Sequence, residues 1–122
     1  VLYFYPRDDT PGCTTEAKEF SALTKEFDKI GFVVVGVSKD SPEKHQKFAD
    51  KYDLAITLGS DEEGKTIERY GVWVEKNMYG KKMMGIERAT FLIDSKGMIR
   101  QIWRKVKAPG HAAAVLTAAK SL

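Results

Sequence analysis

The fold is decided by the opening segment Val1–Glu16, which reads VLYFYPRDDTPGCTTE. Its continuous apolar run, Val1–Tyr5, predicts a central strand that is covered on both faces. Thr10 followed by Pro11 predicts the start of a helix, because a hydroxyl residue can cap the first turn and proline has no N–H to leave unpaired there. A strand, a short loop and a helix are therefore expected to follow one another directly.

Cys13 is the only cysteine of the chain, and this pattern places it in the first turn of the helix. Unpaired backbone N–H groups and the positive end of the helix dipole lie at that position. Both favour a thiolate over a thiol, and the thiolate is the reactive form of cysteine. The segment therefore predicts a nucleophile, although a lone buried cysteine is usually a small core residue.

Length and composition predict one domain over residues 1–122, since 43% hydrophobic content is enough for a single core. A net charge of +3 is too mild to indicate a nucleic acid or a membrane as partner. With one cysteine and two scattered histidines there is no metal-ligand spacing, and we expect neither a metal nor a cofactor. A single cysteine also excludes an internal disulfide and favours a reducing, cytoplasmic location.

Hydrophobic periodicity and turn residues predict alternating strands and helices along the rest of the chain. Helices are expected over residues 11–29, 42–52, 65–70 and 111–122, and strands over residues 32–37, 56–58, 89–93 and 98–103. Residues 72–85 are expected to form a loop. This order predicts an α/β fold whose parallel sheet carries helices on both faces and an antiparallel strand at its edge.

The opening segment also resembles a known catalytic motif. Pro6-x-x-x-Thr10-x-x-Cys13 resembles the peroxidatic motif of the peroxiredoxins, and the longer string Phe4–Ala17 is similar to their bacterioferritin-comigratory, or PrxQ, subfamily. The signal is specific because fixed residues recur over a dozen positions in the expected strand, loop and helix. The resemblance implies a thiol-dependent peroxidase that reduces hydrogen peroxide and small organic hydroperoxides through a sulfenic acid on Cys13.

The similarity continues through residues 70–73 and 88–94, and so covers nearly the whole chain. It implies a thioredoxin-like fold with a central mixed β-sheet and helices on both faces. The family carries an N-terminal β-hairpin before this point, so we expect the domain over residues 1–122 to be N-terminally incomplete. An organellar targeting segment could be missing with it. Relatives of this type are often monomeric, and we expect a monomer or a weak dimer.

The chemistry of peroxide reduction suggests a role for each residue of the motif. Cys13 would be the attacking thiolate, and the Thr10 hydroxyl can hydrogen-bond the sulfur and the peroxide. Backbone N–H groups of Gly12 and Cys13 can line the pocket, and Gly12 lets the backbone approach closely. Pro6 would shield the sulfur from water and stiffen the loop.

Four other polar residues are assigned roles of different kinds. By the resemblance, Arg88 reaches into the same pocket, where its fixed charge favours the thiolate and steers the peroxide oxygens. Glu16 either complements the helix dipole or joins the family's hydrogen-bond network. His45 lies in a polar helical stretch and His111 near a helix start, and both are expected to be solvated.

The chain departs from many relatives in lacking a second cysteine five residues after the first, where it has Lys18. The sulfenic acid would therefore need an external thiol: a thioredoxin, a glutaredoxin, a small thiol or Cys13 of another copy. A redox-sensing module without efficient turnover is the alternative function. A thiol–disulfide oxidoreductase would need Cys-x-x-Cys, but the fourth position of that motif is Glu16.

Overall fold

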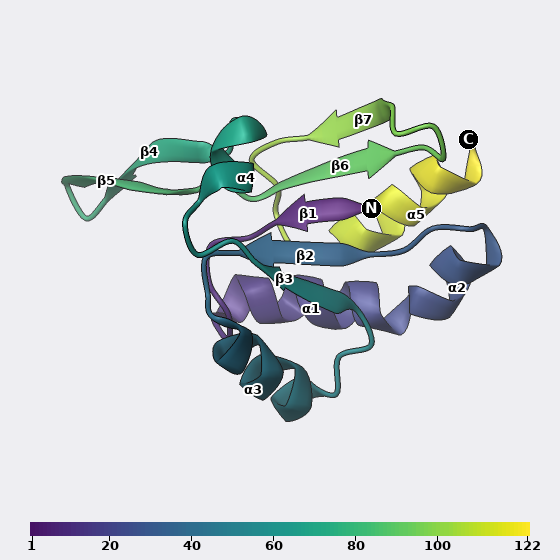
Figure 1. Ribbon diagram of the computed structural model, residues 1–122, viewed down its shortest axis with the longest axis horizontal. Coiled ribbons are helices and arrows are strands. Elements are labelled where there is room, and N and C mark those ends of the chain that lie inside the picture. The colour runs from purple at the N-terminus through teal and green to yellow at the C-terminus, as the bar shows by residue number, and fades with distance from the viewer.

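A five-stranded mixed sheet forms the centre of the computed structural model, which describes the backbone of residues 1–122 and their side chains except that of residue 78 (Figure 1). Its strands, in spatial order, are β3 (Thr57–Ser60), β2 (Val35–Ser38), β1 (Leu2–Phe4), β6 (Ala89–Ile93) and β7 (Ile99–Trp103). The first three are parallel, whereas β6 and β7 run antiparallel to their neighbours. The predicted mixed, thioredoxin-like sheet is confirmed.

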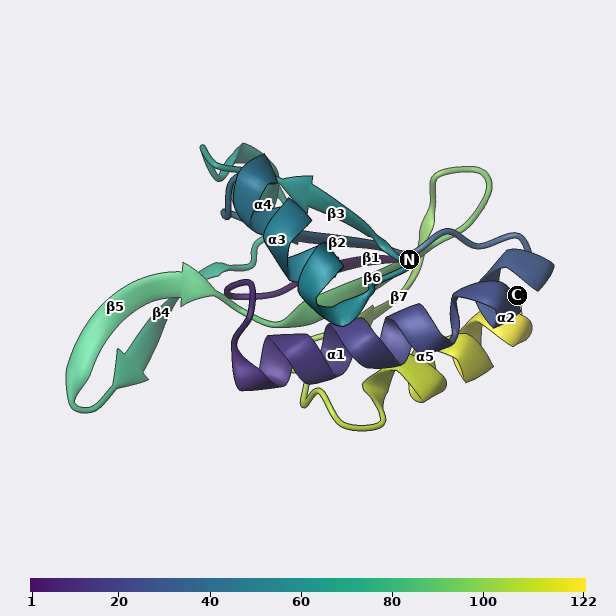
Figure 2. The same ribbon diagram turned by 90° about the horizontal axis from the view of Figure 1, so that it is seen from below.

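Helices cover both faces of the sheet, but unequally. They are α1 (Pro11–Ala22), α2 (Thr24–Lys29), α3 (Pro42–Tyr52), α4 (Lys65–Arg69) and α5 (His111–Lys120). One core layer joins Tyr3 of β1 to residues of α1, α2, α3 and α5, and the other joins Phe4 to Ile67 of α4. The sheet therefore lies between α1 and α5 on one side and α4 on the other (Figure 2). Within the part of the chain that is described, no helix has the length and apolar character needed to cross a bilayer.

The start of α3 agrees with the helix-start signals in the sequence, whereas the helix predicted over residues 11–29 is divided in two. At the start of α3 the Ser41 hydroxyl accepts a hydrogen bond from the Lys44 N–H at 3.3 Å, and Pro42 occupies the first helical position. The single helix predicted over residues 11–29 is wrong, because the chain breaks at Leu23 into α1 and α2. There the Leu23 N–H turns back to the Phe20 carbonyl, which tightens the last turn of α1.

Residues 72–85 do not form the predicted loop; most of them belong to a two-stranded hairpin, β4 (Trp73–Met78) and β5 (Lys81–Ile86). The hairpin projects from one end of the molecule in both views (Figures 1 and 2). Its turn residues, Tyr79 and Gly80, both have positive φ, which is the geometry that a two-residue hairpin turn favours. Most of β5 is exposed, so the strand has no buried face. Without one, its sequence does not alternate between apolar and polar residues, which is the pattern that predicts a half-buried strand.

Both histidines are buried, contrary to the prediction that they are solvated. His45 on α3 faces the loop after β1, and His111 at the start of α5 lies against Thr90 of β6. His111 Nε2 and the Thr90 hydroxyl are 2.7 Å apart in the first core layer. Burial, with a smaller contribution from the charge of Arg88, lowers the pKa of His111 to about 4. His111 is therefore neutral near pH 7 and serves as a core residue.

We predict that His111 makes the protein less stable in mild acid. Its pKa is about 4 in the folded state and 6.5 in the unfolded chain, so its contribution is complete above about pH 6.5 and declines as the pH falls towards 4. His111→Gln keeps a polar partner for Thr90 but does not titrate. Urea unfolding should show a stability difference between wild type and variant that changes by about 2 kcal/mol over this range. A difference that is independent of pH would contradict the assignment.

Candidate active site

Cys13 lies where β1, the following loop and α1 meet. It is the third residue of α1 and is only 2% exposed. The Thr14 N–H donates to the Thr10 carbonyl at 2.8 Å, which closes the first helical turn around the sulfur-bearing residue. The predicted position of the cysteine, at a helix start after a central strand, is therefore the observed one.

Arg88 contacts Cys13 although the two residues are 75 positions apart in the sequence. The antiparallel register of β1 and β6 pairs Phe4 with Ala89, so Arg88 precedes β6 at the edge where β1 ends. Its Nη2 donates to Cys13 Sγ at 3.3 Å, and its Nη1 donates to Glu16 Oε1 at 2.7 Å. One guanidinium thus bridges the sulfur and a carboxyl group, both of which belong to α1.

Glu16 is completely buried beneath this guanidinium. Burial raises the pKa of Glu16 to about 7, although the charge and hydrogen bond of Arg88 act to lower it. Among the described groups its second oxygen, Oε2, has no hydrogen-bond partner. Of the two roles considered for Glu16, the geometry favours the hydrogen-bond network over a solvated partner for the helix dipole.

Thr10, Gly12 and Pro6 surround the first turn in different ways. The Thr10 hydroxyl donates to the Arg7 carbonyl at 2.9 Å and makes no cap bond, so the prediction of a hydroxyl cap is wrong. A Cβ at Gly12 would lie 3.0 Å from Arg88 Nη2, which shows how closely the guanidinium approaches the backbone there. Pro6 is exposed and lines the surface above Arg88.

A surface hollow of about 530 Å³ opens above Arg88, between Pro6 and the hairpin. Lys76 of β4 lines it and also lines a neighbouring groove of about 610 Å³. Burial, followed by the charge of Arg88, lowers the pKa of Lys76. Sequence reasoning missed this second cation because it treated residues 72–85 as a loop. The pairing of β4 with β5, on which Lys76 reaches the same hollow as Arg88, has no short sequence signature.

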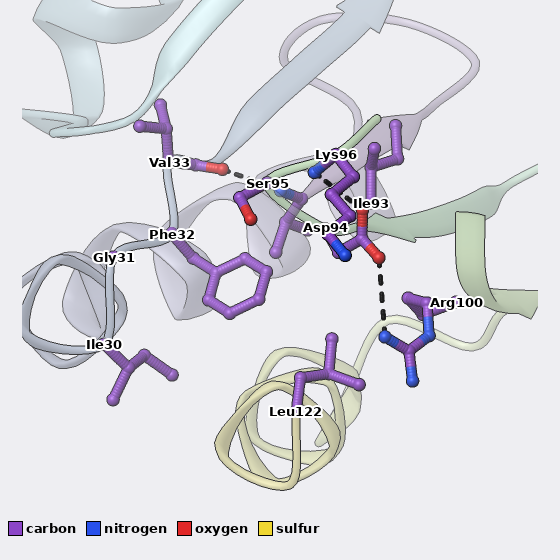
Figure 3. Close-up of a pocket in the computed structure, with 11 residues that line it drawn as sticks. Ile30, Gly31, Phe32, Val33, Ile93, Asp94, Ser95, Lys96, Arg100 and Leu122 are labelled. Carbon is purple, nitrogen blue, oxygen red and sulfur yellow. Dashed lines mark hydrogen bonds and ion pairs between the residues drawn. The ribbon is translucent and has the colours of Figure 1, made fainter. Parts of the chain in front are cut away.

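Another hollow, also of about 530 Å³, lies at the far end of the sheet (Figure 3). It is bordered by the turn after β6 and by the connection between α2 and β2, and includes Phe32, Val33 and Leu122. An Arg100–Asp94 contact of 3.4 Å closes one side. The lining contains neither Cys13 nor Arg88, so this hollow is separate from the candidate active site.

Comparisons with known proteins agree with this geometry. Residues 1–102 match the model of the AhpC/TSA family. The chain is 54% identical to a putative peroxiredoxin Bcp from Coxiella burnetii over 95% of its length and 77% of that protein. It is 49% identical to peroxiredoxin Bcp from Bacillus subtilis over its full length and 78% of that protein. A solved structure of the Xanthomonas campestris bacterioferritin comigratory protein is 51% identical, with a TM-score of 0.93, over 98% of this chain and 76% of that one.

Matches of this extent show the class of protein to which the fold belongs: the chain is a member of the AhpC/TSA family. Within that family it is a peroxiredoxin of the Bcp, or PrxQ, type, and therefore a thiol-dependent peroxidase. The resemblance found in its sequence is confirmed over nearly the entire chain.

We predict that Glu16 changes its protonation near neutral pH in the folded protein. With a pKa of about 7, against 4.5 when unfolded, its contribution to stability is complete below about pH 4.5 and is lost as the pH rises through 7. Infrared difference spectra should show a buried protonated carboxyl band that disappears above about pH 8 and is absent in Glu16→Gln. In Arg88→Met the transition should move to higher pH, because the charge that lowers the pKa is gone. A transition that stays in place would contradict the coupling.

Proposed function

We propose that Cys13 is the peroxidatic residue of this enzyme. Its thiolate attacks the terminal oxygen of a hydroperoxide, the O–O bond breaks, and the sulfur becomes a sulfenic acid. The departing alkoxide or hydroxide takes a proton from solvent and leaves as alcohol or water. The observation that carries the proposal is the 3.3 Å contact between Arg88 Nη2 and Cys13 Sγ at a helix start. A fixed positive charge at that distance favours the thiolate and lies where charge develops in the transition state.

The surrounding residues would orient the peroxide rather than react with it. Arg88 would steer the peroxide oxygens, and Glu16 would hold the guanidinium in place. The Thr10 hydroxyl, one turn before the sulfur, would rotate from the Arg7 carbonyl towards the bound peroxide. Pro6 would limit the access of water from the open hollow, and backbone N–H groups at Gly12 and Cys13 would add donors.

Hydrogen peroxide and small organic hydroperoxides are the proposed substrates. The structural study of the Xanthomonas relative concerns its alkyl peroxide reduction activity. In this chain, the hollow above Arg88 includes Val74 and Val106 together with charged residues, so it could accept a short alkyl group as well as a bare hydroperoxide. We assign no larger substrate.

Recycling would use an external thiol, because Cys13 is the only cysteine in the sequence. Lys18, where many relatives have their second cysteine, is exposed on α1 and cannot form a disulfide. A reductant thiol attacks the sulfenic acid and releases water, and a second thiol then frees Cys13 from the mixed disulfide. A thioredoxin, a glutaredoxin or a small thiol would serve in a reducing, cytoplasmic compartment, with the enzyme acting as a monomer or weak dimer.

We predict that Cys13→Ser abolishes hydroperoxide consumption with a dithiol as reductant, because serine supplies no comparable nucleophile at neutral pH. Lys18→Ala is the control on the same helix and should keep wild-type turnover. Mass spectrometry of the wild-type protein after peroxide and thiol should find a mixed disulfide on Cys13. Turnover by Cys13→Ser would contradict the proposal, and a single burst that no thiol recycles would support the redox-sensing alternative.

We predict that Arg88→Met lowers kcat/KM for hydrogen peroxide by about a hundredfold to a thousandfold, the usual loss when one transition-state donor is removed. Arg88→Lys should recover only part of the rate, because a single ammonium cannot contact Sγ and Glu16 with the guanidinium's two-pronged geometry. Stopped-flow measurement of Cys13 oxidation gives the rate directly. Circular dichroism checks the fold, and a rate within a factor of about three of wild type would contradict the role given to Arg88.

A further inference from the structure

The loop between β1 and α1 is held by a buried ion pair between Asp8, within that loop, and His45, which lies outside the peroxidatic motif. Asp8 Oδ2 and His45 Nδ1 are 2.6 Å apart, and their side chains are only 5% and 6% exposed. The other oxygen of Asp8 accepts a hydrogen bond from the Tyr5 hydroxyl at 2.5 Å. The backbone N–H of Asp8 donates to Asp40 at 2.9 Å, so this one loop residue is bonded to the residue after β1, to α3 and to the loop after β2.

The partner of the second ring nitrogen shows which protons His45 carries. Its Nε2 lies 3.0 Å from the Gly59 carbonyl of β3, and a carbonyl can only accept. Nε2 must therefore donate, which leaves Nδ1 facing the Asp8 carboxylate. Burial acts to lower the pKa of His45, but the hydrogen bonds and charge of Asp8, with the Gly59 carbonyl, outweigh it and raise the pKa. We assign a protonated ring that donates from both nitrogens.

Contacts continue from this pair to the reactive sulfur. Asp8 follows Arg7, whose carbonyl accepts the Thr10 hydroxyl, and the Thr10 carbonyl closes the turn that holds Cys13. The loop's other anchor to α3 is the contact of Asp9 with Lys51 at 2.8 Å and Tyr52 at 2.6 Å. Those contacts are exposed to solvent, so we expect them to hold the loop in place less strongly than the buried Asp8–His45 pair does.

We propose that His45 is a positioning residue for peroxide reduction: through Asp8 it holds the Pro6–Thr10 loop, and so places Cys13 Sγ against Arg88. This role rests on the function proposed for Cys13. Without the Nδ1 donor, the buried carboxylate of Asp8 keeps only the hydrogen bond from the Tyr5 hydroxyl. A buried carboxylate with too few donors is unfavourable, so the loop is expected to shift to a conformation that exposes Asp8 to solvent. Movement of about 1 Å at a reacting centre can lower a rate about a hundredfold.

Two substitutions separate the loop contact from a general structural role. The amide of His45→Asn lies where Nδ1 was and can still donate to Asp8, whereas the longer amide of His45→Gln reaches towards Gly59 instead. We expect H45Q to lose tenfold to about a hundredfold in kcat/KM for hydrogen peroxide. Amide exchange should speed up over residues 7–14 while β1 stays protected. H45N should keep most of the rate and the protection.

Gln46→Ala is the matched control, since Gln46 is the next residue of α3 and bonds only to exposed Asp50 among the described side chains. It should behave as wild type in both measurements. Equal losses in H45N and H45Q, or faster exchange of β1 together with the loop, would overturn the proposal in favour of a structural role. Exchange does not depend on peroxidase activity, so unchanged loop protection in H45Q refutes the clamp itself. By contrast, turnover by Cys13→Ser would refute only the proposed function.

Discussion

The site depends on a single, partly buried guanidinium that is shared between a sulfur and a carboxyl group. Arg88 contacts Cys13 Sγ and Glu16 Oε1 from the edge of β6, and both partners are held by α1. Removing an arginine from solvent is unfavourable unless its N–H groups form hydrogen bonds. Here Nη2 donates to Cys13 Sγ and Nη1 donates to Glu16 Oε1. Because Glu16 is fully buried and its pKa is near 7, the charge available to balance Arg88 varies across the neutral range. The electrostatic surroundings of Cys13 Sγ are therefore sensitive to pH.

Sheet pairing is what makes this contact possible. Cys13 and Arg88 are 75 residues apart, and they meet because β6 inserts next to β1 in antiparallel register. The arginine at the start of one strand then lies beside the loop that leaves the end of the other. Lys76 reaches the same region by a separate route, on a hairpin that projects from the body of the molecule. The hollow above Arg88 is thus built from three distant parts of the chain.

Elements that support the loop come from yet another part of the sequence. His45 belongs to α3 and Asp40 to the loop between β2 and α3, and they reach Asp8 because β2 pairs with β1 in parallel and brings that loop to the end of β1. The turn that carries Cys13 is held partly by residues outside its own sequence segment, so its rigidity can vary without any change in that segment. The recycling by an external thiol that we propose would require access to a cysteine that is 2% exposed. The strength of this attachment would then influence reduction of the sulfur as well as its oxidation.

What the sequence determined by itself was local. The apolar run of β1, the Thr10–Pro11 helix start and the position of Cys13 depend on neighbouring residues, and so did the starts of α3 and of β6. The motif resemblance supplied Arg88 as a candidate, which no local pattern would have done. The hairpin at residues 73–86 was missed because its exposed strands lack a buried face. The burial of His45 and His111, the paired state of Glu16 and the place of Lys76 were decided only by tertiary structure. Each depends on which distant side chain lies opposite, and that information is carried by strand register and helix packing rather than by any short stretch of residues.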